Sequence, residues 1–259
     1  MPSSSPIRLG AVSYLNTKPL VYDLAKFAPD VTVEYDLPSR LSTGLAEGRF
    51  DVALIPSIEY FADPSYSIIS DACIACRGPV LSVKLFSRVP MDKIRSLSLD
   101  EGSRTSATLV RVLLRERFGI VPTTQSLPIG AEASETTTDA VLLIGDRAIH
   151  SPKLEYVEHW DLGEQWCAWA ELPFVFAMWV ARSADLPDKL ARALESARDA
   201  GVKNLEVIAR QEASQVGLSL DACLSYLRDN LYFYLGPREQ QGLELFRQYA
   251  ARSMIAARS

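Results

Sequence analysis

The sequence has only two histidines and four cysteines among its 259 residues. A structural zinc site usually needs four Cys or His ligands. Cys73 and Cys76 form a C-x-x-C with no second copy, in an apolar run that leads into Gly78-Pro79. A redox C-x-x-C usually lies between a strand and a helix. We therefore predict buried thiols and no metal site, and keep a redox or metal role for Cys73 and Cys76 as the alternative.

Long apolar runs and an excess of positive charge are also missing. No apolar stretch reaches the roughly 20 residues of a membrane-spanning helix. The opening Met-Pro-Ser-Ser-Ser-Pro has neither the basic nor the apolar region of a secretory signal. The net charge of −5 gives no basic surface for nucleic acid. We expect a cytoplasmic protein without membrane or nucleic-acid partners, in which an anionic ligand would need a local site.

The stretch from Ile7 to Leu20 predicts a strand, a polar loop and a helix. Ile7–Val12 is a short apolar strand, and the residues after it, including Asn16, form hydrogen bonds readily. Pro19 is predicted to open the helix, where its missing N–H has no intrahelical partner in any case. Ligands of open α/β sheets bind at the carboxyl ends of strands. The loop is therefore a candidate binding loop, and a capped turn without a ligand is the alternative.

Other predicted strands end in polar residues in the same way. Ser57 follows the continuous apolar strand Val52–Ile55, and Asp146 follows the strand Ala140–Ile144. Ser103, Thr105 and Ser106 follow a predicted strand and precede a helix predicted from about Ala107. The N–H groups and dipole of a helix N-terminus favour an anion, although one of these hydroxyls could simply cap the helix. Asp146 could likewise cap a turn or face a ligand.

The order of the elements predicts an α/β protein with two lobes. Two strand-loop-helix units come first, and from Ser183 onward the apolar residues follow helical spacing. The extended segments Val80–Ser87 and Phe174–Val180 flank the second unit. We predict lobe I from residues 6–88 and 178–259, and lobe II from residues 89–177. The helical C-terminal tail is expected to pack on lobe I.

Several segments resemble the chorismate dehydratase family, which belongs to the futalosine route to menaquinone. They occur in the family's order: Gly10 to Leu20 (GAVSYLNTKPL), Asp51 to Tyr60 (DVALIPSIEY), Gly78 to Ser87 (GPVLSVKLFS), Arg104-Thr105-Ser106, Ile144-Gly145-Asp146 and Leu172 to Trp179 (LPFVFAMW). The resemblance implies a type-2 periplasmic-binding-protein-like fold with a cleft between the lobes. It also implies a lyase that converts chorismate to 3-[(1-carboxyvinyl)oxy]benzoate and water.

This reaction ends in an aromatic ring, so we expect no metal and no redox cofactor. Preorganised hydroxyl and N–H donors can stabilise the charge that develops when the ring proton leaves. We expect Thr105 and Ser106 to bind a carboxylate, with Ser57 contributing. Asn16 and Ser82 are expected to orient the reacting centre and the leaving hydroxyl. The general base is either Asp146 or the substrate's own carboxylate.

Two alternatives share the fold. The related 1,4-dihydroxy-6-naphthoate synthase family opens with a different loop and has a histidine where this sequence has Asp146. A non-catalytic protein that binds a small anion would have the same two lobes and no reaction. Formation of a product distinguishes the enzyme from the binding protein.

Overall fold

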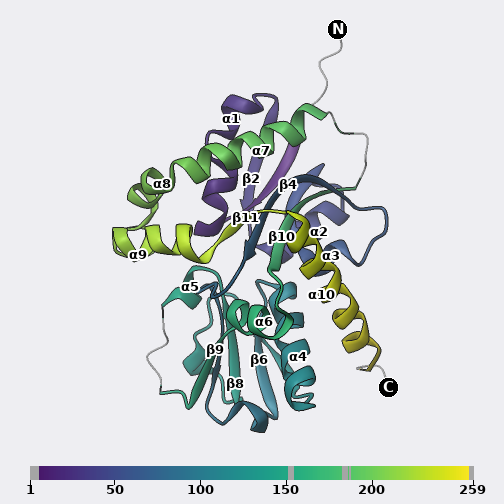
Figure 1. Ribbon diagram of the computed structural model, residues 1–259, viewed down its shortest axis with the longest axis vertical. Helices are drawn as coiled ribbons and strands as arrows, with labels where there is room; N and C mark the ends of the chain where they lie inside the picture. Colours follow the sequence, from purple (N-terminus) through teal and green to yellow (C-terminus); the bar gives the residue numbers. More distant parts are fainter. Residues whose placement is uncertain (1–5, 151–154, 183–185, 187, 257–259) are drawn as a thin grey trace. The chain divides into compact units, whose positions relative to one another are not determined.

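The computed structural model describes residues 6–150, 155–182, 186 and 188–256, and its strands form two separate sheets (Figure 1). The chain groups into two compact units. The first contains the chain up to Ala75 together with Val175–Gly236, and the second contains Cys76–Phe174 and the chain from Pro237 onward. In the part of the chain that is described, the helices are all too short or too polar to cross a membrane.

The first unit is built on a six-stranded sheet of order β11-β4-β10-β3-β1-β2. Strand β1 pairs in parallel with β2 and β3, and β3 pairs antiparallel with β10. All residues of β3 are buried, which agrees with its predicted continuous apolar run. The strands are β1 (Ile7–Val12), β2 (Val31–Asp36), β3 (Val52–Pro56), β4 (Ser67–Cys76), β10 (Phe174–Ala181) and β11 (Tyr232–Tyr234).

The polar loop after β1 is itself helical, which differs from the prediction. A 3₁₀ helix, η1 (Leu15–Val21), includes Asn16 and contains Pro19 in its interior. The reason is packing against α7 (Asp188–Lys203): a Cβ on Gly201 would lie only 2.0 Å from the Pro19 carbonyl oxygen. Tertiary contact with α7 therefore decides the backbone of this loop.

The remaining helices of the first unit are short apart from α2 and α8. Figure 1 shows α7 beside α1, and the two helices are in contact. The π-helix η4 directly precedes β11. These elements are α1 (Leu24–Phe27), α2 (Pro38–Ala46), α3 (Ser57–Tyr60), α8 (Leu205–Glu212), α9 (Leu220–Ser225) and η4 (Tyr226–Asn230).

The second unit is built on a five-stranded sheet of order β7-β6-β8-β5-β9. Strand β6 pairs in parallel with β7 and β8, and β5 runs antiparallel to both β8 and β9. The strands are β5 (Val83–Ser87), β6 (Ser96–Asp100), β7 (Thr123–Leu127), β8 (Ala140–Ile144) and β9 (Glu158–Asp161). The helices are η2 (Met91–Lys93), α4 (Arg104–Phe118), η3 (Ala133–Glu135), α5 (Asp146–Ile149), α6 (Leu162–Ala170) and α10 (Pro237–Ala256).

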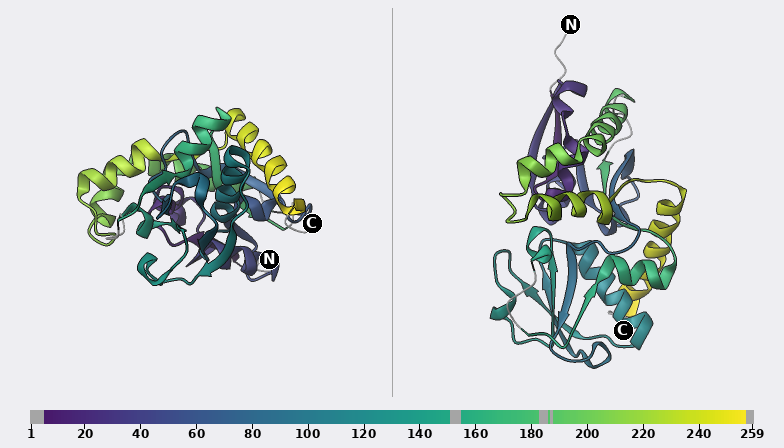
Figure 2. Two further views of the ribbon diagram at one scale, coloured as in Figure 1. Left: turned by 90° about the horizontal axis from the view of Figure 1, so that it is seen from below. Right: turned by 60° about the vertical axis from the view of Figure 1, so that its left-hand side comes forward.

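The unit boundaries differ from the predicted lobes of residues 6–88 with 178–259 and 89–177. Strand β5 lies inside the second sheet because it pairs on both sides, with β8 and β9. Helix α10 also belongs to the second unit, where the Phe246 ring lies 5.9 Å from Trp166 and 4.9 Å from Phe174. The predicted tail is therefore divided: α7, α8 and α9 pack in the first unit, and α10 packs in the second (Figure 2).

The sequence reasoning also missed α6. The sequence predicts a strand at Leu154–Val157, of which Leu154 lies outside the described residues, and a turn at Asp161-Leu162-Gly163. The strand β9 instead begins at Glu158, and Asp161 caps α6 by accepting a hydrogen bond from the Glu164 backbone N–H at 3.1 Å. An Asp followed three residues later by Glu is a helix-start signal that was available in the sequence.

Candidate functional site

Two predicted site residues lie at the carboxyl edge of the first sheet. Strands β1 and β3 are adjacent and parallel, so the loops that follow them leave the sheet at the same edge. Asn16 is half-buried in η1, and its side-chain oxygen accepts a long hydrogen bond of 3.5 Å from Thr17. Ser57 begins α3 and is fully buried, and its hydroxyl donates to the Val175 carbonyl at 2.8 Å. Ser57 thus joins α3 to β10.

The other four predicted residues, Ser82, Thr105, Ser106 and Asp146, lie at one edge of the second sheet. Strands β6 and β8 are parallel neighbours, so the residues that follow them share an edge. Strand β5 runs antiparallel to β8, which places Ser82, the residue before β5, at that same edge. The Gly145 N–H donates to the Ser82 carbonyl at 2.9 Å and joins the two segments directly. The topology therefore groups residues that are distant in sequence.

Helix α4 begins at Arg104, three residues earlier than predicted, and Ser103 is its cap. The Ser103 hydroxyl oxygen accepts from the Ser106 N–H at 3.2 Å and lies 3.1 Å from the Ser106 hydroxyl. Thr105 and Ser106 lie in the first turn and are buried, and of the three hydroxyl residues that could cap the helix, Ser103 is the one that does so. Within the described chain, one O–H of the Ser103–Ser106 pair is used between the two hydroxyls. The other can donate to an anion at the positive end of the helix dipole.

A buried carboxylate holds the loops after β6 and β8 together. Asp100 ends β6 and accepts hydrogen bonds from the backbone N–H groups of Gly102 at 2.9 Å and Ile144 at 3.1 Å. It also accepts from Arg147, whose Nε lies 2.9 Å from Asp100 Oδ2. Charge-assisted bonds of this kind are stronger than neutral ones. Asp100 thereby fixes the start of α5, where Asp146 is half-buried.

Asp161 positions Ser82, and the sequence reasoning missed this role. Its carboxylate accepts from the Val80 N–H at 2.9 Å and from the Leu81 N–H at 2.6 Å. Leu81 has a φ of 60°, in the left-handed region, where a residue with a side chain loses about 1–2 kcal/mol. Strained backbone of this kind persists where surrounding contacts hold it, and it is common at functional sites. The Asp161 bonds are the contacts that hold it here.

Lys84 is the second residue of β5 and lies two residues after Ser82. Burial lowers the pKa of Lys84, while the charge of Asp161, its register partner on β9, raises it. Lys84 has no ion-pair partner among the residues described. It therefore adds a half-buried cationic amine to the segment that carries Ser82.

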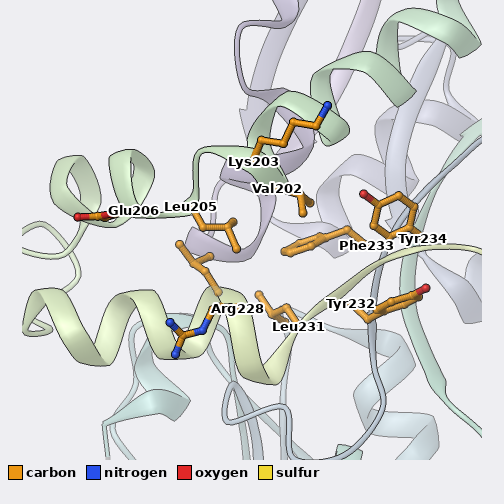
Figure 3. Close-up of a pocket in the computed structure, with 10 residues that line it drawn as sticks. Val202, Lys203, Leu205, Glu206, Arg228, Leu231, Tyr232, Phe233 and Tyr234 are labelled. Atoms are coloured by element: carbon orange, nitrogen blue, oxygen red, sulfur yellow. The ribbon is translucent and has the colours of Figure 1, made fainter.

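A separate cavity of about 370 Å³ lies within the first unit. Figure 3 shows Phe233 pointing toward Val202 and Leu205, while the charged ends of Lys203, Glu206 and Arg228 point away from this apolar centre. The lining residues come from α7, α8, η4 and β11 and the turns beside them. None of the predicted site residues lines this cavity.

Comparisons with known proteins identify relatives along nearly the whole chain. A family model for menaquinone biosynthesis matches residues 7–252. A curated relative, the chorismate dehydratase of Thermus thermophilus, is 31% identical, and the match covers 93% of this chain and 94% of that protein.

Solved structures show which fold the two sheets form. A protein from Archaeoglobus fulgidus matches with a TM-score of 0.75 at 15% identity and covers 98% of this chain and 99% of its own. A Candida albicans protein described as having the generic periplasmic-binding-protein fold matches with a TM-score of 0.61 at 10% identity, over 96% of this chain and 94% of its own. At these identities the likeness concerns the fold alone. It confirms the predicted α/β, two-lobed periplasmic-binding-protein-like class.

Proposed function

This chain belongs to the menaquinone biosynthesis family, and we propose that it is a chorismate dehydratase, a lyase acting in the cytoplasm. The observation that carries the proposal is the match to the Thermus thermophilus chorismate dehydratase, at 31% identity over 93% of this chain. The reaction removes water from chorismate and leaves 3-[(1-carboxyvinyl)oxy]benzoate.

The chemistry asks for positioning and for charge stabilisation. Chorismate loses the proton on its ether-bearing carbon and its ring hydroxyl, and the aromatic ring of the product supplies the driving force. As the proton leaves, negative charge can delocalise through the diene into the ring carboxylate. Preorganised donors that bind this charge more strongly in the transition state than in the ground state accelerate the reaction.

The edge of the second sheet offers such donors. We assign the ring carboxylate to Thr105 and Ser106 in the first turn of α4, where the remaining O–H of the Ser103–Ser106 pair and the helix dipole add to the field. Ser82 would donate to the leaving hydroxyl. Its hydroxyl has no hydrogen-bond partner among the described residues, and Asp161 fixes the turn before it.

Asn16 and Ser57, at the edge of the first sheet, are proposed to orient the substrate. Asn16 has a side-chain amide that can both donate to and accept from the substrate. Ser57 would have to exchange the Val175 carbonyl for a substrate oxygen before it could donate, since its O–H is already used.

Two groups can act as the base that removes the ring proton, and in either case the protein contributes mainly by positioning the base. Asp146 lies half-buried at the start of α5, at the same sheet edge as Ser82. The enolpyruvyl carboxylate of chorismate is the other candidate, and the protein would then only hold it near the proton that leaves.

Kinetics of paired variants on α4 test the site. Thr105→Val removes a hydroxyl with little change in shape, and Thr108→Val, one turn further along α4, is the matched control. A hydrogen bond to a charged group contributes about 1.5–3 kcal/mol, so Thr105→Val should lower kcat/KM for chorismate roughly 10- to 100-fold. Equal kcat/KM for Thr105→Val and the unmodified protein would contradict the assignment, and absence of product from the unmodified protein would contradict the reaction itself.

A further inference from the structure

The two cysteines of the C-x-x-C belong to one strand, and one of them also touches a helix. Cys73 and Cys76 both lie in β4, whose pairing with β11 shifts register between Ala72 and Ala75. Both are buried. The thiol of Cys76 contacts α6, and this helix carries Cys167, a cysteine outside the C-x-x-C.

Cys76 packs against the face of α6 that carries Cys167. A Cβ on Gly163 would lie 2.6 Å from Cys76 Sγ, so the sulfur rests on the helix where only glycine leaves room. Cys167 is four residues after Gly163 and lies on the same helix face. Its thiol donates a hydrogen bond to the Cys76 carbonyl oxygen, which lies 3.9 Å from the Cys167 Sγ. Two thiols from separate elements thus meet at one point.

The two thiols have different environments. The neighbouring Cys76 side chain lowers the pKa of Cys167, and the Phe174 backbone N–H and the Arg238 charge act in the same direction, whereas burial acts against them. Burial raises the pKa of Cys76. Cys167 is half-buried whereas Cys76 is fully buried. The thiolate is the reactive form of cysteine, so Cys167 is the thiol that an oxidant reaches and oxidises first.

We propose that Cys167 and Cys76 are a redox-sensitive pair, in which peroxide oxidises Cys167 and Cys76 then closes a disulfide. The Cys167 thiolate attacks the O–O bond of hydrogen peroxide, forming a sulfenic acid and releasing hydroxide. The Cys76 thiol loses its proton, its sulfur attacks the sulfenic sulfur, and hydroxide leaves with that proton as water. In total the two thiols lose two electrons and the peroxide is reduced to water.

The disulfide would connect the end of β4 to α6, the helix that Asp161 caps. Because Asp161 also holds the turn before Ser82, the oxidation would occur beside the contacts that position this residue. The thiol pair and the predicted site residues share no side chain, so the oxidation can be measured independently of chorismate turnover.

Mass spectrometry of peroxide-treated protein tests the pair. The folded protein is treated with hydrogen peroxide, unfolded, alkylated with N-ethylmaleimide and digested without reductant. We expect alkylation at Cys73 and Cys223 only, and a linked peptide pair containing Cys76 and Cys167 that a reductant separates. Cys76→Ser, or Cys76→Ala if the serine variant unfolds, should stop at a sulfenic acid on Cys167 that dimedone traps.

The control is Cys223→Ser, which should form the same link as the unmodified protein because Cys223 is a buried thiol in α9. Alkylation of all four cysteines after peroxide treatment would overturn the proposal. So would a link between Cys73 and Cys76, or a sulfinic acid on Cys167 without any link to Cys76.

Discussion

Ser82 depends on a carboxylate that is far from it in the chain. Asp161 accepts three backbone N–H groups, from Val80, Leu81 and Glu164, and thereby connects the turn before Ser82 to the start of α6. It also offsets the cost of the left-handed Leu81. One side chain thus determines both a helix start and the position of a candidate catalytic hydroxyl.

Replacing Asp161 should therefore affect stability and activity together. Asp161→Asn keeps one oxygen acceptor but loses the charge and part of the bonding to Val80 and Leu81. We expect a loss of about 1–3 kcal/mol in the free energy of unfolding, measured by urea titration, and a lower kcat for chorismate. The control is Glu158→Gln on the same strand, β9. If Asp161→Asn and Glu158→Gln unfold at the same urea concentration, Asp161 does not hold this turn.

Asp146 provides the residue-scale test of the base. If positioning dominates and the substrate's carboxylate removes the proton, Asp146→Asn should keep a large share of kcat, because the amide preserves the shape of the side chain. Steady-state kinetics and a binding titration with chorismate measure the two quantities separately. A near-complete loss of kcat with unchanged binding and an intact fold would identify Asp146 as the base.

At the scale of elements, α7 determines the conformation of the candidate loop. Gly201 of α7 touches the Pro19 carbonyl, and a methyl group there would lie 2.0 Å from that oxygen. Gly201→Ala should separate α7 from η1 and lower the free energy of unfolding by about 1–3 kcal/mol or more, because close-packed elements cannot absorb the added volume. It should also raise KM for chorismate through Asn16.

The matched control for this change is Gly78→Ala. A Cβ on Gly78 has no atom within 4 Å, so this variant should melt close to the unmodified protein. Thermal unfolding followed by circular dichroism compares the two. Equal melting temperatures for Gly201→Ala and Gly78→Ala would show that the stability of the protein does not depend on the close contact between Gly201 and Pro19.

Asp139 links the starts of β6 and β8 and makes their connection sensitive to acid. The backbone N–H of Arg95 hydrogen-bonds to the Asp139 carboxylate at 2.8 Å and, with Ser96, lowers its pKa below the usual range. A carboxyl with a lowered pKa in the folded state stabilises the protein at neutral pH. This stabilisation disappears as the pH falls below about 4 and through the lowered pKa.

Asp139→Asn should therefore be less stable than the unmodified protein at pH 7, and the difference should shrink in acid. Urea midpoints measured at several pH values from neutrality down to about pH 2 test this, since the Asp139 carboxyl becomes neutral like the amide as the pH falls through its lowered pKa. A difference that stays constant across this range would mean that the charge of Asp139 contributes nothing.

At the scale of the whole molecule, the apolar runs of single segments predicted the strands, but pairing between distant strands determined which unit each strand belongs to. The apolar runs of β3 and β8 indicated buried strands directly. The pattern of Val80–Ser87 predicts a strand too, and Val83–Ser87 forms β5, but its partners β8 and β9 come from residues far along the chain, and nothing in its own pattern states which sheet it joins. Its assignment to lobe I failed for that reason.

The candidate site shows the same limit. The positions of Thr105, Ser106 and Asp146 after strands followed from the sequence, because parallel neighbours end at one edge. The contact of Cys76 with Cys167 did not follow from the sequence, because the two residues are 91 positions apart. The C-x-x-C suggested Cys73 as the partner of Cys76 instead. The role of Asp161 required knowing that β9 lies beside β5.

The most direct test of the proposed function is the fate of chorismate. The purified protein is treated with a chelator, mixed with chorismate, and the mixture is followed by chromatography and mass spectrometry. We predict a product that is lighter by one water and absorbs ultraviolet light as a substituted benzoate. Chorismate that is bound but recovered unchanged would contradict the account and indicate a binding protein of the same fold.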